Sequence, residues 1–104
     1  MGLRIVLRPE TEADLFQARD WYEQEDAEIA AAFVDSFEAI ISRIKAMPEL
    51  YAVALKNIRR AKLRRFPYLV YYRVLSDRIE VIAVLHGSRD PRVWQDRADR
   101  NNIS

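Results

Sequence analysis

Hydrophobic residues along this chain follow two periods, which divide it into a helical first half and a strand-rich second half. Between residues 29 and 47 the apolar positions recur every three or four residues and form one stripe, made of Ile29, Phe33, Phe37, Ile40, Ile44 and Met47. This spacing predicts an amphipathic helix, and Pro48 would end it.

A strand and a shorter helix are predicted before this stripe. Residues 3–8 are short and β-branched, which favours a strand that ends at Pro9. Thr11 and Asp14 fit a capping box and predict a helix to about residue 23. Its apolar face would hold Ala13, Phe16 or Leu15, Ala18 and Tyr22. The acidic turn before residue 29 implies an antiparallel helical hairpin.

After Pro48 the period becomes two, which predicts strands at 58–65, 68–75 and 79–86, with a tight turn at residues 76–77. Asp90 and Pro91 fit the cap and first position of a short terminal helix or turn. The tail 98–104 is expected to fray. We therefore expect one α+β domain over residues 1–104 in the order β-α-α-β-β-β. Its helical hairpin would pack on one face of an antiparallel sheet.

Composition excludes most catalytic and metal chemistries. The chain has 104 residues, no cysteine, two glycines and one histidine. These numbers exclude a disulfide framework, a dinucleotide or P-loop cradle, and a metal cluster of recognisable spacing, so we expect no cofactor. We find neither a signal peptide nor a run that could span a membrane, and expect a soluble cytoplasmic protein.

Charge is strongly divided between the two halves. Residues 1–54 carry −6 and residues 55–104 carry +7, and residues 56–65 hold six cations and no acid. Alternation in 58–65 turns Ala61 and Leu63 to the core and Arg60, Lys62 and Arg64 to the opposite face. Such a face would suit a phosphate or an acidic peptide, although a charged sheet edge that resists aggregation has the same pattern.

Nine residues are candidates for binding a target or a partner: Arg59, Arg60, Lys62, Arg64, Arg65, Tyr72, Arg73, Arg92 and Trp94. For Tyr72 the simpler interpretation is packing in the sheet, and for Trp94 it is an anchor for the terminal turn. Cleavage of RNA through its own 2′-hydroxyl also remains open, because it needs no metal and could use Arg, Lys, His or Tyr.

The segments "RRAKLRRFPYLVYYRV" and "IEVIAVLHGSRDPRVWQDR" resemble the RelE/ParE superfamily, the toxins of type II toxin–antitoxin (plasmid stabilisation) systems. The similarity extends upstream to "EADLFQARDWYE" and "FVDSFEAIISRIKAMPELY", and so covers almost the whole chain. RelE-like members cut messenger RNA, usually on the ribosome. ParE-like members share the fold and instead poison DNA gyrase. Both kinds are neutralised by an antitoxin whose extended tail wraps around the toxin.

Two departures favour the ParE-like branch. No tyrosine follows Tyr72, and residues 58–65 contain no glutamate, whereas the ribonucleases use both residue types. The resemblance therefore implies a growth-inhibiting toxin that poisons gyrase without catalysis, through its basic sheet face and C-terminal segment. Its partner would be a cognate antitoxin, in a hetero-oligomer with it, and the toxin itself could form a homodimer.

Two alternatives stay open. One is a metal-independent ribonuclease in which Arg65 and Arg89 stabilise phosphate charge and His86 donates or accepts the proton. The other is an inactive relative that only binds its antitoxin.

Overall fold

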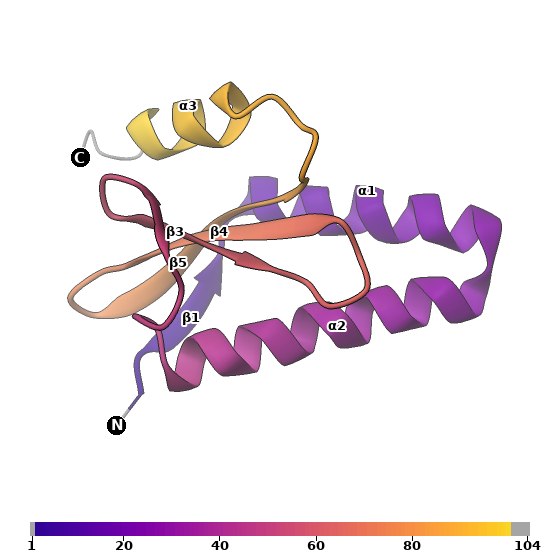
Figure 1. Ribbon diagram of the computed structural model, residues 1–104, viewed down its shortest axis with the longest axis horizontal. Helices are drawn as coiled ribbons and strands as arrows, with labels where there is room; N and C mark the ends of the chain where they lie inside the picture. The colour runs from indigo at the N-terminus through magenta and orange to yellow at the C-terminus, as the bar shows by residue number, and fades with distance from the viewer. Residues whose placement is uncertain (1, 101–104) are drawn as a thin grey trace.

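The computed structural model describes residues 2–100, which form a strand, two helices, four strands and a third helix (Figure 1). The first half supplies β1 (Arg4–Leu7), α1 (Pro9–Glu25) and α2 (Ala27–Ala46). The second half supplies β2 (Val53–Leu55), β3 (Ile58–Lys62), β4 (Tyr68–Val74), β5 (Arg78–His86) and α3 (Arg92–Arg100). The predicted α+β class and order are confirmed. Of the tail expected to fray, residues 98–100 belong to α3 and the rest lie outside the described residues.

The sheet is mixed, with strand order β1-β5-β4-β3-β2. β1 runs parallel to β5, and the other neighbours are antiparallel. The short strand β2 was not predicted, and the parallel pairing of β1 with β5 makes the sheet mixed where a wholly antiparallel sheet was expected. β3 ends at Lys62 rather than at residue 65, because the chain turns through Arg65, whose φ is 72°.

The α1–α2 hairpin covers one face of the sheet, here called the hairpin face. Phe33 and Ile44 of α2 are fully buried there against Val70 and Val81 of the central strands. Asp26 separates the two helices, and its carboxylate accepts a hydrogen bond from the backbone N–H of Glu28 at 2.7 Å. The acidic turn thus caps α2, which stabilises the hairpin.

α3 packs on the opposite face, called the α3 face, and lies across the sheet from α2 in Figure 1. Its anchor is Trp94, which stacks on Tyr71 with ring centroids 4.6 Å apart. A bulge in β5 places Ile82 and Ala83 together under α3, while Val81 faces the hairpin. The nearly continuous apolar run of β5 is therefore explained by burial on both faces.

α1 begins at Pro9, so the prediction that Thr11 is its N-cap is wrong. Thr11 is buried, and its hydroxyl donates to the carbonyl of Val81 at 2.8 Å. Asp14 accepts from the backbone N–H of Val84 at 3.0 Å. Pairing with β1 ends at Val81, so α1 side chains supply hydrogen bonds along the remaining edge of β5.

Candidate binding site at the loop end of the sheet

Two loops meet at one end of the sheet, and we call this region the loop end. One loop, residues 63–67, joins β3 to β4, and the other, residues 87–91, joins β5 to α3. The backbone N–H of Gly87 donates to the carbonyl of Pro67 at 2.7 Å, and Tyr68 pairs with His86 where the strands begin and end. The loops are therefore held together by backbone contacts, independently of their charged side chains.

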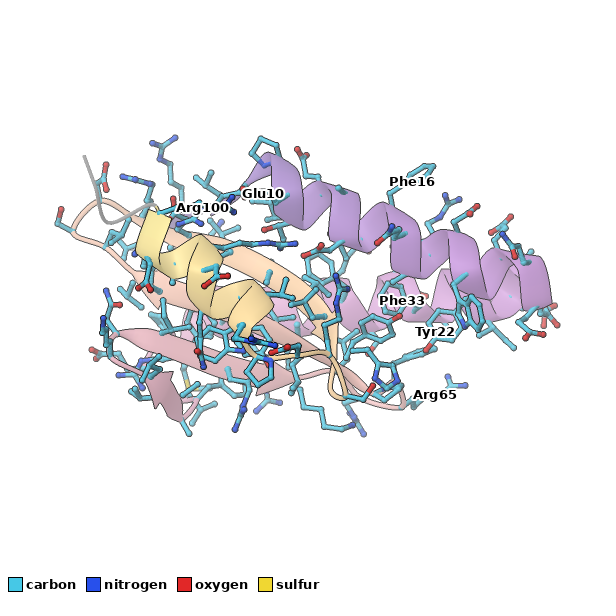
Figure 2. All side chains as sticks on the ribbon, turned by 90° about the horizontal axis from the view of Figure 1, so that it is seen from above. Glu10, Phe16, Tyr22, Phe33, Arg65 and Arg100 are labelled. Atoms are coloured by element: carbon cyan, nitrogen blue, oxygen red, sulfur yellow. The ribbon has the colours of Figure 1, made fainter. Side chains whose placement is uncertain are left out.

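The first loop presents two exposed arginines, Arg64 and Arg65. α2 holds it in place, because the hydroxyl of Ser36 donates to the carbonyl of Arg64 at 2.7 Å. Arg65 adopts a left-handed conformation, which is costly for a residue with a Cβ, and its guanidinium lies 5.9 Å from the ring centroid of Phe66 (Figure 2). Both arginines line a shallow hollow of about 280 Å³ beside α2.

The second loop presents His86 and Arg89. The Nδ1 atom of His86 accepts from the backbone N–H of Ser88 at 3.0 Å, which places the proton of the neutral ring on Nε2. The ring packs edge-on against Tyr68, with centroids 5.4 Å apart. Burial raises the pKa of Tyr68, and the nearby positive charge of Arg89 partly offsets this rise. Arg89 thus lies near enough to the phenol of Tyr68 for its charge to act on it.

Asp90 and Arg92 form a separate unit at the start of α3. Their side chains pair at 2.7 Å, and Asp90 also accepts from the backbone N–H of Arg92 at 2.9 Å. These hydrogen bonds lower the pKa of Asp90 to about 2. The predicted capping role of Asp90 is confirmed, and Arg92 has an acidic partner that Arg64, Arg65 and Arg89 lack among the described residues.

The cations of β3 divide between the two faces of the sheet. Arg60 and Lys62 are exposed on the α3 face, as alternation predicts. Lys62 donates to the carbonyls of Leu63 and Phe66 at 3.1 and 3.3 Å, and so supports the first loop. Arg59 lies on the hairpin face, where it donates to the carbonyls of Glu49 and Tyr51. Its contacts fix the segment that follows α2.

Three predicted binding residues are buried within the fold. Tyr72 is 0% exposed and donates to the carbonyl of Pro48 at 2.6 Å, and burial raises its pKa to about 12. Arg73 and Trp94 are each 4% exposed, the first paired with Glu80 and the second stacked on Tyr71. A binding role for these three is corrected to a structural one, because their polar and aromatic groups already contact the protein itself.

The possible ribonuclease residues do not line one cavity. His86 and Arg89 line a hollow of about 330 Å³ beside α1, whereas Arg65 lines the hollow beside α2. Within residues 2–100 no group of three or more His, Asp or Glu side chains is placed to hold a metal ion. In the same range, no helix has both the length and the apolar character needed to cross a membrane.

Sequence reasoning missed an apolar groove between α1 and α2. Its volume is about 380 Å³, and it is lined by Leu7, Glu12, Leu15, Phe16, Arg19, Phe33, Val34, Phe37 and Glu38. Phe16 is 67% exposed and lies on the outside of α1 (Figure 2). Its neighbour Leu15 packs against the core. The consecutive pair Leu15–Phe16 was the available signal, because adjacent helical residues cannot both face one core.

Known proteins resemble this chain in sequence and in fold. Residues 5–91 match the family described as ParE toxin of type II toxin–antitoxin system, parDE. Toxin ParE2 of Mycobacterium tuberculosis, from strains CDC 1551 / Oshkosh and ATCC 25618 / H37Rv, is 32% identical over 92 residues, or 88% of each protein. A solved chain titled "Chromosomal ParDE TA system from P. aeruginosa" matches with a TM-score of 0.72 at 18% identity, over 81% of this chain and 95% of that chain.

The α+β fold and the sequence together define the class as the RelE/ParE superfamily of toxins, which confirms the resemblance. Within that class, the chain belongs to the ParE toxin family of type II toxin–antitoxin systems.

Proposed function

We propose that this toxin arrests growth by poisoning DNA gyrase, and that its loop end contacts the gyrase–DNA complex. The observation that carries the proposal is the set of three exposed arginines, Arg64, Arg65 and Arg89, in two loops joined by a backbone hydrogen bond. None of the three forms an ion pair with a described carboxylate. Their charge is therefore available to a polyanionic target.

The conformation of Arg65 supports this proposal. A left-handed arginine costs stability, and such strain is found where a local conformation serves a function. In this loop the left-handed conformation of Arg65 accompanies the exposure of two consecutive arginine side chains, Arg64 and Arg65. The contacts of Ser36 and Lys62 with this loop keep that presentation fixed before any partner binds.

We also propose that a cognate antitoxin neutralises the toxin by placing apolar side chains in the groove between α1 and α2. The groove is mostly apolar, with Glu12, Arg19 and Glu38 on its lining, and Phe16 stands exposed at its rim. An exposed aromatic beside a preformed apolar groove is typical of a protein-binding surface. The titles of the related proteins, a toxin and a ParDE system, agree with such a partner.

Expression of the toxin in cells tests the proposal. We expect growth arrest with an SOS response, and we expect the triple variant Arg64→Gln, Arg65→Gln, Arg89→Gln to lose both. The matched control is Arg4→Gln, Arg19→Gln, Lys45→Gln, which removes the same charge from exposed residues outside the loop end. Growth arrest without an SOS response would contradict the gyrase proposal. A ribonuclease would be favoured if the toxin cuts transcripts and the His86→Ala variant does not.

A further inference from the structure

A hollow beside the loop end has the walls of a small-molecule site. It lies between α1 and the end of β5 and has a volume of about 330 Å³, within the range of ligand pockets. Ala18 and Val84, both buried, are among its apolar lining residues. Trp21 of α1 also lines it and is 61% exposed, so most of its indole is available for contact.

Three polar side chains of this hollow are not used by the fold. Gln17, Tyr68 and Arg89 line it, and no described residue forms a hydrogen bond or ion pair with their polar heads. The one acid that the described residues contribute to the lining is Asp14, whose two oxygens are bound by Arg97 at 2.6 and 3.0 Å. Besides this paired carboxylate, the hollow offers an aromatic wall, neutral polar groups and the positive charge of Arg89, which has no ion-pair partner among the described residues.

We infer that this hollow binds a nucleotide, with its base against the indole of Trp21 and its phosphate paired with Arg89. An aromatic side chain can stack on the flat face of any base, and a guanidinium pairs with a phosphate through two hydrogen bonds. The amide of Gln17 and the phenol of Tyr68 are placed to contact base edges or sugar. An apolar peptide would leave Arg89 unpaired, and an acidic peptide would leave the indole without a partner.

The nucleotide could be free or part of a single strand. Arg64 and Arg65 lie on the adjoining loop, so further phosphates of a strand would meet further positive charge. The inference does not depend on gyrase poisoning, because its test measures only the binding of a nucleotide to the purified protein.

Tryptophan fluorescence can report on this hollow alone. The chain has two tryptophans, and Trp94 is buried under α3. In the Trp94→Phe variant, all indole emission comes from Trp21, and we expect saturable quenching by adenosine monophosphate. Arg89→Gln is expected to weaken this binding at least tenfold. Arg92→Gln, which removes the same charge from a nearby residue that does not line the hollow, is expected to leave it unchanged. If Trp94→Phe does not fold, the same titration can be followed by NMR in the unmodified protein, through the chemical shift of the indole N–H of Trp21.

Other ligands separate the remaining possibilities. Tighter binding of a short single-stranded oligonucleotide, lost on replacing Arg64 and Arg65, would assign the site to a nucleic-acid strand. Equal affinity for monomer and oligomer would assign it to a free nucleotide. The inference is overturned if adenosine without phosphate binds as well as the monophosphate. It is also overturned if only a polyglutamate peptide binds, or if no ligand gives saturable quenching.

Discussion

Glu80 is a carboxylate that two buried arginines share. One carboxylate oxygen accepts from Arg8 at 2.7 Å and from Arg73 at 2.9 Å, and both arginines are buried. Burial alone would raise the pKa of Glu80, but the hydrogen bonds and charges of the two arginines outweigh it and the pKa is lowered. One ionised carboxylate therefore contacts both buried arginines.

Replacement of Glu80 by glutamine is expected to lower the free energy of unfolding by roughly 3 kcal/mol at pH 7, because it removes a carboxylate charge that two buried cations contact. The lowered pKa means that this stabilisation is complete above the ordinary value of 4.5 and is lost as the pH falls through the folded-state value. Urea unfolding of both proteins from pH 7 to pH 3 checks this. A difference that stays constant down to pH 3 would contradict it.

The strain at Arg65 can be measured with two pairs of variants. Arg65→Gly and Arg65→Ala both remove the guanidinium, but only glycine tolerates a φ of 72° without cost. We expect the glycine variant to be more stable by about 1 kcal/mol in urea unfolding. At Arg64, whose φ is negative, the order should reverse. The same order at both positions would show that Arg65 is not strained.

At the residue scale, alternation predicts which way a side chain points but not what covers it. It placed Arg60 and Lys62 correctly on the face opposite Ala61. It does not show that α3 covers much of that face, so the pattern leaves Arg73 as a binding candidate although its side chain is buried. Which face α3 covers depends on contacts between residues far apart in the chain, which periodicity does not contain.

At the element scale, α1 acts as an edge partner for β5 as well as a core helix. Thr11 and Asp14 match a capping box in sequence, yet both are buried and bind the backbone of β5. The helix starts earlier because Pro9 fits its first turn, where a missing N–H does no harm. A local motif thus predicted the helix but not its first residue, because the bonding partner lies on a strand about seventy positions away.

Two ion pairs connect α1 to α3, and they should differ in strength. Asp14–Arg97 is largely buried, with side chains 8% and 13% exposed, while Glu10–Arg100 lies at the surface (Figure 2). Arg97 also donates to the carbonyl of Ile82, so the buried pair joins α1, β5 and α3.

Asp14→Asn is therefore expected to destabilise the protein by roughly 3 kcal/mol, since it removes the buried carboxylate charge that pairs with Arg97. Glu10→Gln, the matched control, should cost less than about 1 kcal/mol. Urea unfolding monitored by the fluorescence of Trp94 measures both changes. Equal losses for the two variants would show that the buried pair does not hold α3 in place.

At the scale of the whole molecule, the groove between α1 and α2 and the loop end are formed by different residues. Phe16 lines the groove between α1 and α2, and Arg64, Arg65 and Arg89 lie at the loop end. The sequence predicted the loop end through its cations. It did not predict the groove, because that surface exists only once two helices pack together.

This separation predicts a variant that stays toxic but escapes its antitoxin. Phe16→Asp places a charge at the apolar groove, so we expect growth arrest to persist while binding to the cognate antitoxin weakens at least tenfold by calorimetry. Ala13→Asp, at an exposed position of the same helix that does not line the groove, should bind the antitoxin normally. Normal neutralisation of Phe16→Asp would place the antitoxin elsewhere.

The most direct test of the central claim is a DNA-cleavage assay with purified gyrase, supercoiled plasmid and purified toxin. We predict that the toxin causes gyrase-linked double-strand breaks in the plasmid. The Arg64→Gln, Arg65→Gln, Arg89→Gln variant should cause few or none, while the Arg4→Gln, Arg19→Gln, Lys45→Gln control should match the unmodified toxin. Unchanged supercoiling and intact plasmid in the presence of folded, growth-arresting toxin would contradict the account.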